Sequence, residues 1–528
     1  MFERRTTLKA IGSVLAGTVC AALATALGPT TDGSAAASGP GPGVVRVKVL
    51  TINIFYGGDE LDLTTGDFCA VPDGCVQTLR LVEQTIRRSD ADVVGVQEAE
   101  RNTELIARRL GWYGSNRAHV MSRFPIIDPP GSDGRYVFVQ IAPGRVMAVA
   151  NAHLPSDPYG PYLVRDGGSR AEVLMLERQV RLPAVAPLVR VLPALARRGI
   201  PVVLTGDFNS PSHLDWTPAV TAVRPDVRYP VPWPASAALA AAGLRDSYRE
   251  AHPDPVAVPG FTWTPGGPES ARREVFDRID WVLTAGPSVT VASTVVGEAG
   301  GPDVGVGLAR YPTDHRGVVS TLDVRPAVPP LLVAPAERRV TIGSRLPVTF
   351  HGPGHGSERV ALLDGAGRRR AAVAIQDRDG VVRLPTAGLG RGRYRVALLA
   401  ADGTVLSSTP VWLYPAGEPT RIFVDRDRYP VGSPIGVRWT GAPGMALDWV
   451  SVFRCRPSGC AADSSYLVYG YTGNRIEGRT VLGPDSIAGN ASWPLPAGRY
   501  QVRLLTDDGL RSVARSREFE VLPGSATG

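Results

Sequence analysis

The sequence predicts a layered α/β domain in its first part and two all-β sandwiches in its second part. Between Val44 and about Val324, short apolar segments alternate with helical segments, which is typical of sheets covered by helices. A Pro-rich stretch follows, and after it the helical periodicity disappears. Two stretches that resemble each other then fill most of the remaining chain.

Six segments of the first part are predicted to be strands, because they are short, rich in Val and Ile, and bounded by turn residues. They are Val44–Ile54, Asp92–Val96, Arg145–Leu154, Pro201–Leu204, Phe276–Leu283 and Gly317–Val324. Helices are predicted at Val76–Arg88 and Arg170–Arg198, the second from apolar residues that recur at helical period. Pro183 and Pro187 are expected to break or restart this second helix.

The two C-terminal stretches share one frame. Each has a Gly-Ser turn, an alternating strand and a turn of Gly and Pro, and each closes on a Gly-Arg-Tyr strand followed by an Asp-Gly hairpin turn. They are predicted to be immunoglobulin-like β-sandwiches at residues 336–416 and 420–523, because each has the length of one such module. The preceding domain is predicted at residues 44–325, with residues 326–335 as a Pro-rich linker.

The N-terminus has the pattern of an export signal. Arg4 and Arg5 open a twin-arginine pattern, a weakly apolar run extends from Ala10 to Leu27, and residues 35–37 offer an Ala-Ala-Ala cleavage site. A membrane anchor is the alternative, but the run is short and diluted by Gly and Thr. We therefore expect residues 1–37 to be a signal peptide and the protein to be secreted.

Cleavage of the signal would remove Cys20 and leave two close pairs of cysteines. An even number of cysteines outside the cytosol argues for disulfides. Local pairing of Cys69 with Cys75 and of Cys455 with Cys460 is expected, although four cysteines allow three connectivities. A zinc site is the alternative, but the sequence lacks the usual C-x₂-C spacing and clustered histidines.

The charge of the chain is basic but diffuse. The formal net charge is +7 at pH 7, and nearly all of the basic excess is Arg. This charge permits an anionic substrate, but the sequence has no dense Lys/Arg block of the kind that binds nucleic acid as a tail. A solvated, mildly basic surface is therefore expected.

Polar side chains stand where the predicted strands end. Asp207 and Asn209 follow the apolar stretch Pro201–Leu204, and side chains two apart in extended chain point the same way. Taken alone, this stretch also fits an ordinary turn. Asp280 is harder to explain structurally, since an ionised carboxylate within a buried strand is costly unless it has a partner. Further polar residues at strand boundaries are Asn53, Glu98, His153, Asp314 and His315.

This set of residues suits the hydrolysis of a phosphate ester, which needs a divalent cation, a positioned water and hydrogen-bond donors. Asn53 and Glu98 offer the oxygen ligands that Mg²⁺ prefers. His153 and His315 can donate to a phosphoryl group or move a proton near neutral pH. Asp280 would orient His315. Asp207 would position the water, and Asn209 would act as a neutral hydrogen-bond donor.

Seven short stretches resemble the endonuclease/exonuclease/phosphatase superfamily and follow the order of that family. They are TINI, VQE, SRFPI, NAHL, GDFN, RIDWV and TDH. The resemblance covers about residues 44–324. It implies a four-layer α/β sandwich, in which two packed mixed β-sheets are flanked by helices. It also implies a site at one end of the sheets that depends on Mg²⁺, with Mn²⁺ or Ca²⁺ as alternatives.

The resemblance also implies roles for individual residues, position by position. The metal-site residues would be Asn53, Glu98 and Asp314. The catalytic residues would be His153, which matches the phosphate-contacting histidine, the pair Asp207 and Asn209, and the Asp–His pair Asp280 and His315.

The sequence thus predicts a secreted, Mg²⁺-dependent phosphoesterase that hydrolyses a phosphodiester or a phosphomonoester by in-line attack of water. An acidic insertion after Asn53 is expected at the rim of the site and favours a phospholipid head group or small phosphodiester over duplex DNA. Its acids are Asp59, Glu60, Asp62 and Asp67. An extracellular nuclease acting on DNA or RNA is the alternative within the same class.

A second alternative comes from another class of protein. The chain could be a non-catalytic surface-binding protein with a decayed enzyme domain, but the complete set from Asn53 to His315 argues against decay. The two sandwiches are expected to bind a surface or polymer, and the protein is expected to be a monomer.

Overall fold

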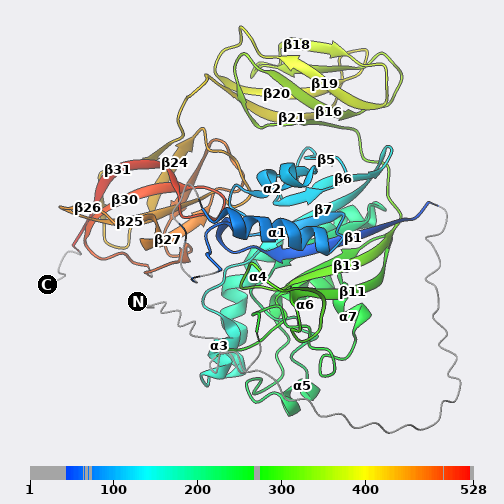
Figure 1. The fold of residues 1–528 in the computed structure, drawn as a ribbon. Coiled ribbons are helices and arrows are strands. Elements are labelled where there is room, and N and C mark those ends of the chain that lie inside the picture. The colour runs from blue at the N-terminus through cyan, green and yellow to red at the C-terminus, as the bar shows by residue number, and fades with distance from the viewer. Residues whose placement is uncertain are drawn as a thin grey trace, which may run out of the picture.

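The computed structural model describes residues 43–63, 65, 69, 74–266, 274–491 and 493–523. The predicted signal peptide, Cys20 and Asp67 lie outside the described residues. The chain forms an α/β body and two β-sandwiches. Figure 1 shows the first sandwich above the α/β body and the second beside the end that carries α1 and α2.

Two mixed β-sheets form the centre of the α/β body. The first has the strand order β12-β11-β13-β1-β2-β4-β3, and the second has the order β5-β6-β7-β8-β10-β9. The strands of the first sheet are β1 (Val45–Asn53), β2 (Val93–Gln97), β3 (Tyr113–Ser115), β4 (Val120–Ser122), β11 (Ser288–Glu298), β12 (Val304–Leu308) and β13 (Gly317–Val324). Those of the second are β5 (Ile126–Ile127), β6 (Val137–Ala142), β7 (Arg145–His153), β8 (Val202–Asp207), β9 (Arg245–Asp246) and β10 (Asp280–Ala285).

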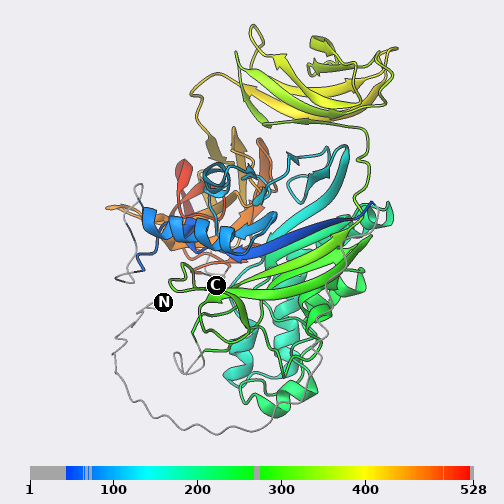
Figure 2. The same cartoon turned by 45° about the vertical axis from the view of Figure 1, so that its right-hand side comes forward.

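Helices cover the outer face of each sheet. The helices are α1 (Val76–Arg88), α2 (Thr103–Leu110), α3 (Gly160–Arg165), α4 (Arg170–Arg197), α5 (Pro218–Val223), α6 (Pro234–Ala241) and α7 (Ser247–Ala251). One apolar core joins α1 and α2 to the first sheet, a second core lies between the sheets, and a third joins α4 and α6 to the second sheet. The predicted four-layer sandwich is confirmed (Figure 2).

The long helix α4 departs from the prediction. It runs without a break through Pro183 and Pro187, so the expected interruption is wrong. The reason is tertiary packing: Leu188, Leu192 and their neighbours belong to the core under the second sheet, and this burial outweighs the lost backbone hydrogen bonds. In the described residues, α4 is the one helix long and apolar enough to cross a membrane, and one of its faces packs in the core of the second sheet.

Two strand limits near the polar residues also differ from the prediction. Strand β8 does not stop at Leu204 but continues to Asp207, because it is paired on both sides, with β7 and with β10. Strand β10 does not begin at Phe276 but at Asp280. Asp280 is therefore the first residue of its strand and not an interior one.

The predicted linker is partly a strand. Ala327 forms a β-bridge to Val146 of the α/β body, and β14 (Leu332–Pro335) pairs with β16 (Arg345–His351). Residues 326–335 are therefore not a free linker, because backbone pairing at both ends ties the first sandwich to the second sheet of the α/β body.

Each C-terminal module consists of two packed sheets, as the immunoglobulin-like prediction requires. The further strands of the first module are β15 (Arg339–Thr341), β17 (Arg359–Leu363), β18 (Arg369–Ala374), β19 (Asp379–Pro385), β20 (Gly392–Leu399) and β21 (Val405–Tyr414). The second module contains β22 (Arg421–Val424), β23 (Arg428–Pro430), β24 (Ile435–Thr440), β25 (Trp449–Arg456), β26 (Gly459–Cys460), β27 (Tyr466–Tyr471), β28 (Gly478–Leu482), β29 (Ile487–Ala488), β30 (Gly498–Leu505) and β31 (Ser512–Leu522).

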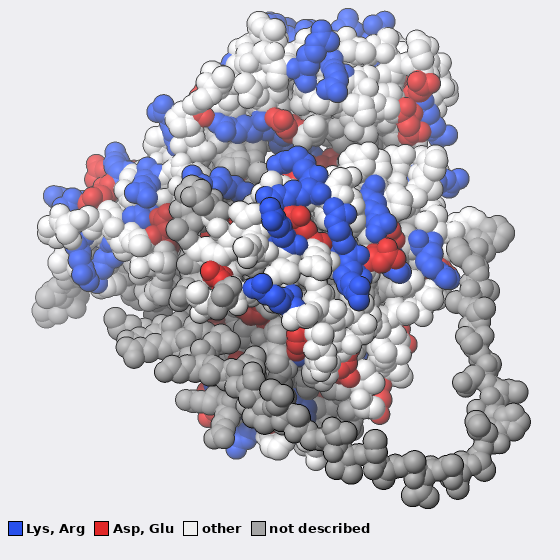
Figure 3. Space-filling view, in the orientation of Figure 1, with Lys and Arg blue, Asp and Glu red and all other residues white. Residues whose placement is uncertain are grey.

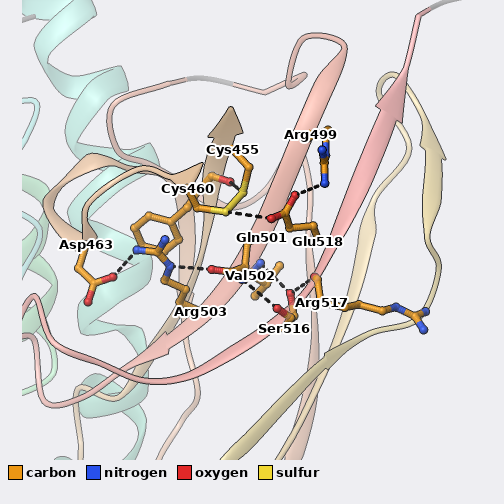
Figure 4. Close-up of a disulfide and its surroundings, with 11 residues drawn as sticks. Cys455, Cys460, Asp463, Arg499, Gln501, Val502, Arg503, Ser516, Arg517 and Glu518 are labelled. Atoms are coloured by element: carbon orange, nitrogen blue, oxygen red, sulfur yellow. Dashed lines mark hydrogen bonds and ion pairs between the residues drawn. A yellow bond between two sulfur atoms is a disulfide. The ribbon is translucent and has the colours of Figure 1, made fainter. Parts of the chain in front are cut away.

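Two disulfides close short loops. The structure joins Cys69 to Cys75 in the insertion after β1, and Cys455 to Cys460 in the hairpin of β25 and β26. Figure 4 shows the second disulfide next to the exposed ion pair of Arg499 and Glu518.

A buried Arg just before β10 joins the loop after β8 to β9, the edge strand of the second sheet. The guanidinium of Arg278 is fully buried, and its Nη2 lies 2.9 Å from Asp215 Oδ2 and 2.7 Å from Asp246 Oδ2. We expect Arg278→Met to lower the free energy of unfolding by about 3–5 kcal/mol in urea denaturation, because it leaves two buried carboxylates short of a partner. Arg108→Met is the matched control, since its pair with Glu104 is exposed and should contribute little. Equal losses in the two variants would contradict this expectation.

Candidate active site

The register of the second sheet aligns three of the predicted residues. His153 is the ladder partner of Asp207, and Asp207 is the ladder partner of Asp280. Side chains of directly opposite residues lie on the same face of a sheet. His153, Asp207 and Asp280 therefore form a row across the ends of β7, β8 and β10.

The first sheet brings a second group to this row. Asn53, the last residue of β1, is the partner of Gln97, and Glu98 follows directly. The Asn53 amide donates from Nδ2 to Glu98 Oε1 at 3.1 Å and to Asp207 Oδ2 at 3.0 Å. Its Oδ1 accepts from the backbone N–H of Phe55 at 3.0 Å. Asn53 thus joins the two sheets by holding one carboxylate from each side.

His315 and Asp280 form a buried pair. His315 Nδ1 lies 3.0 Å from Asp280 Oδ2, and His315 Nε2 faces Asp207 Oδ2 at 3.6 Å. Burial alone would lower the pKa of His315, but the carboxylates of Asp280 and Asp207 outweigh it and raise this pKa well above its usual value. Burial raises the pKa of Asp280 to about 6, against the opposing effect of His315. The pair therefore favours a protonated imidazole.

His153 is held from outside the α/β body. Its Nδ1 lies 2.6 Å from Oδ2 of Asp508, a residue of the second sandwich. Its Nε2 lies 3.8 Å from Asp207 Oδ2 and 3.9 Å from Glu98 Oε1, is buried, and has no hydrogen-bond partner among the described residues. Burial lowers the pKa of His153, but Asp508, Asp207 and Glu98 more than compensate and bring it to about 9. A buried N–H thus points to the centre of the site.

Asn209 and Asp314 complete the predicted set. The backbone N–H of Asn209 donates to Asp207 Oδ1 at 2.9 Å, and its Nδ2 donates to the carbonyl of Leu154 at 2.9 Å. Its amide therefore holds the turn after β8, at a left-handed φ of 48° that Asn tolerates. Asp314 adjoins His315, and burial raises its pKa to about 7, with Glu98 acting in the same direction.

Three residues at the site were not among the predicted ones. Thr313 Oγ1 donates to the backbone oxygen of Asn53 at 2.8 Å, and the Trp263 ring lies 4.9 Å from the His315 ring. Thr313 stands in the TDH stretch and could have been found there. Trp263 and Asp508 carry no local signal, because only the folded chain brings them to His315 and His153.

The donors present fit a divalent cation. Carboxylate oxygens of Asp207 and Asp280 lie within 4.8 Å of one another, and Asp280 Oδ1 is buried without a hydrogen-bond partner among the described residues. The carboxylate of Glu98 adds hard oxygen atoms of the kind that Mg²⁺ prefers. Asn53 was predicted to bind the cation through its side-chain oxygen. Its side-chain amide would have to flip to do so, because Oδ1 accepts a hydrogen bond from the backbone N–H of Phe55.

Comparison with known proteins identifies the α/β body. Residues 50–315, just over half of the chain, match the model of the Endonuclease/Exonuclease/phosphatase family. An uncharacterized protein of Caenorhabditis elegans is 28% identical over 269 residues, which are 46% of this chain and 80% of that protein.

The solved structures that match the chain have low sequence identity to it. An endonuclease/exonuclease/phosphatase from Beutenbergia cavernae is 20% identical with a TM-score of 0.32, and the match covers 70% of this chain and 100% of that chain. An AP endonuclease from Archaeoglobus fulgidus is 17% identical with a TM-score of 0.31, covering 52% and 98%. The human OSCAR ligand-binding domain is 15% identical with a TM-score of 0.23, covering 37% and 98%.

Proposed function

Because the chain belongs to the endonuclease/exonuclease/phosphatase family and is a metal-dependent phosphoesterase, we propose that its substrate is a small phosphodiester, with a phospholipid head group as the favoured class. The observation that carries the proposal is the buried row of His153, Asp207 and Asp280, joined by His315 and Glu98. Such a site suits one phosphoryl group held by several donors at once.

The side chains have complementary roles in this proposal. His315, kept protonated by Asp280, would donate a proton or hydrogen bond from Nε2 at the phosphoryl group. The Nε2 of His153, which has no hydrogen-bond partner among the described residues, would donate to a second phosphoryl oxygen. Asp207, between the two histidines, would orient the attacking water. A divalent cation, bound through carboxylates such as Glu98, would neutralise charge on the phosphoryl oxygens.

Charge and burial around the site support a small substrate over duplex DNA. His315 is 4% exposed, and the nearby turn of the second sandwich adds the acidic Asp507 and Asp508. The carboxyl group of Glu100 lies next to Gly509 of this turn. Burial, together with the acidic neighbours Glu60 and Asp507, raises the pKa of Glu100 to about 8. A polyanionic duplex needs several cationic contacts to its backbone. Figure 3 shows that Arg and Lys side chains of this face gather over the region of α1 and α2, which cover the outer face of the first sheet, with fewer acids between them.

We also propose that the enzyme is exported and works outside the cell. The twin-arginine pattern at Arg4 and Arg5 and the two disulfides support this location, since disulfides persist in oxidising compartments. An extracellular nuclease stays the alternative.

The test is a substrate panel with Mg²⁺: bis(p-nitrophenyl) phosphate, sphingomyelin and phosphatidylinositol vesicles, inositol phosphates, RNA and supercoiled plasmid. The variant His315→Ala controls for contaminating activity. We expect phospholipid or small diester to be hydrolysed with a higher kcat/KM than the plasmid. Faster cleavage of plasmid or RNA would favour the nuclease, and no turnover by the wild type would favour a decayed enzyme domain.

A further inference from the structure

A hairpin turn of the second sandwich reaches into the active site. It joins β30 to β31 and carries Asp507, Asp508 and Gly509. Asp508 Oδ2 lies 2.6 Å from His153 Nδ1, and Asp508 Oδ1 accepts from the hydroxyl of Tyr471 at 3.2 Å. Both oxygen atoms of this carboxylate are therefore fixed, one by its own module and one by the catalytic histidine.

The carboxylate of Asp448 binds the backbone of this turn. Asp448 is fully buried and accepts from the backbone N–H of Asp507 at 3.2 Å and of Gly444 at 2.8 Å. The backbone N–H of Asp508 donates to the carbonyl of Leu447 at 3.0 Å. Asp507 and Asp508 both have left-handed φ angles, of 59° and 62°, which Asp adopts more readily than most residues. Contacts within the second sandwich thus fix the position of Asp508 independently of His153.

Other contacts dock this module, independently of Asp508. His119 Nε2 lies 2.6 Å from Asp507 Oδ1, and both side chains are buried. Arg117 donates to the backbone oxygens of Gly444 and Asn474. The two neighbouring acids of the turn therefore have different partners: Asp507 belongs to the docking interface, and Asp508 faces the site.

We propose, on the basis of the function proposed above, that Asp508 is a positioning residue for His153 and that the second sandwich thereby completes the active site. A carboxylate at Nδ1 keeps a proton on that nitrogen and fixes the rotation of the ring. Nε2 then points between Asp207 and Glu98, where it can meet a phosphoryl oxygen. Without Asp508, the His153 ring loses the contact at Nδ1 that sets this direction.

The first sandwich offers a matched control for the same chemical change. Counted from the Gly-Arg-Tyr strand of each module, Asp402 occupies the position of Asp508: Asp402 follows Gly392 by the same interval at which Asp508 follows Gly498. Asp402 is exposed, and its carboxylate accepts a hydrogen bond from the nearby backbone N–H of Thr404 at 2.9 Å. The variant Asp402→Asn should therefore leave turnover unchanged.

The test is a double-mutant cycle on bis(p-nitrophenyl) phosphate with Mg²⁺. We expect Asp508→Asn to lower kcat about 10- to 100-fold, the usual effect of losing a partner that orients an active-site histidine, with a smaller change in KM. In the His153→Ala background the same substitution should cost nothing further, because the two residues act as one unit. An equal loss in both backgrounds, or wild-type kcat in Asp508→Asn, would overturn the inference.

A second measurement does not depend on activity. The Nδ1 proton of a histidine bound to a carboxylate gives a proton NMR signal far downfield of the amide region. We expect one such signal to vanish in both His153→Ala and Asp508→Asn and to persist in Asp402→Asn. If no signal is common to the first two variants, the contact is absent in solution and the inference fails. A wild type that hydrolyses nothing in the panel would refute the proposed function and leave this measurement to decide on Asp508.

Discussion

The variant His315→Ala is expected to lower kcat roughly 10²- to 10⁴-fold, the usual contribution of one acid–base group. The physical reason is the pairing of the ring, because Asp280 Oδ2 lies 3.0 Å from Nδ1 and Asp207 Oδ2 lies 3.6 Å from Nε2. These two carboxylates favour the protonated ring and fix its orientation. Alanine removes both the donor and the proton. Steady-state rates on the best substrate of the panel measure this loss, and raising Mg²⁺ should not restore it.

Two further variants make the result specific. Asp280→Asn should lose part of the same rate, because the amide keeps a polar contact to His315 Nδ1 but not the charge. His213→Ala is the matched control, since His213 is a half-buried histidine whose ring contacts Ser236 and not the site. If His315→Ala and His213→Ala turn over substrate equally well, His315 has no part in the chemistry.

The fold class and the candidate residues could be predicted because their signals are local. Strands such as Gly317–Val324 are short apolar runs bounded by turns, and Asn53 and Asp207 stand where such runs end. Once β7, β8 and β10 pair in register, residues that are far apart in the chain become neighbours. Residues at the ends of these strands, such as His153, then lie in the same row.

What could not be predicted depends on packing over long distances. The proline residues of α4 indicated a break, but the helix continues through them and packs in the core of the second sheet. Asp280 was expected inside a strand that begins at Phe276, but residues 276–279 lie before β10: Phe276 and Ile279 are buried without belonging to the strand, and Asp277 forms an isolated bridge to Trp263. Asp508 is 355 residues from His153 and lies in a turn whose copy in the first sandwich is exposed. Both turns share the Asp-Gly step, so the contact of Asp508 with His153 follows from the docking of the second module and not from this step alone.

The sequence also left two explanations open for Asn209, and the geometry combines them. Its backbone N–H donates to Asp207 in a turn, as the ordinary structural explanation requires. The same turn fixes the carboxylate of Asp207 beside Asn53 and the two histidines. A turn residue can thus serve the site by holding its neighbour, which residue type and spacing alone do not reveal.

The variant Glu98→Ala is expected to abolish turnover at low Mg²⁺ and to regain part of it at high Mg²⁺. Glu98 lies beside Asn53 and Tyr56, with Oε1 and Oε2 held at 3.1 Å and 3.2 Å by their N–H groups, and its charge faces the centre of the site. If Glu98 holds the cation, its loss weakens binding while the remaining carboxylates still provide oxygen atoms. The rate as a function of Mg²⁺ concentration should then shift to higher concentrations, unlike that of His315→Ala.

Glu100 provides the control for this prediction. It follows Glu98 by two residues and shares its left-handed backbone, with φ angles of 48° and 53°. Burial and nearby acids raise the pKa of Glu100 to about 8, so its carboxyl is mostly neutral at pH 7 and Glu100→Gln should change the Mg²⁺ dependence little. Glu98→Gln, which keeps one oxygen but loses the charge, should fall between wild type and Glu98→Ala. If Glu98→Ala is fully active at low Mg²⁺, Glu98 does not bind the cation, and Asp207 and Asp280 become the ligands to test next.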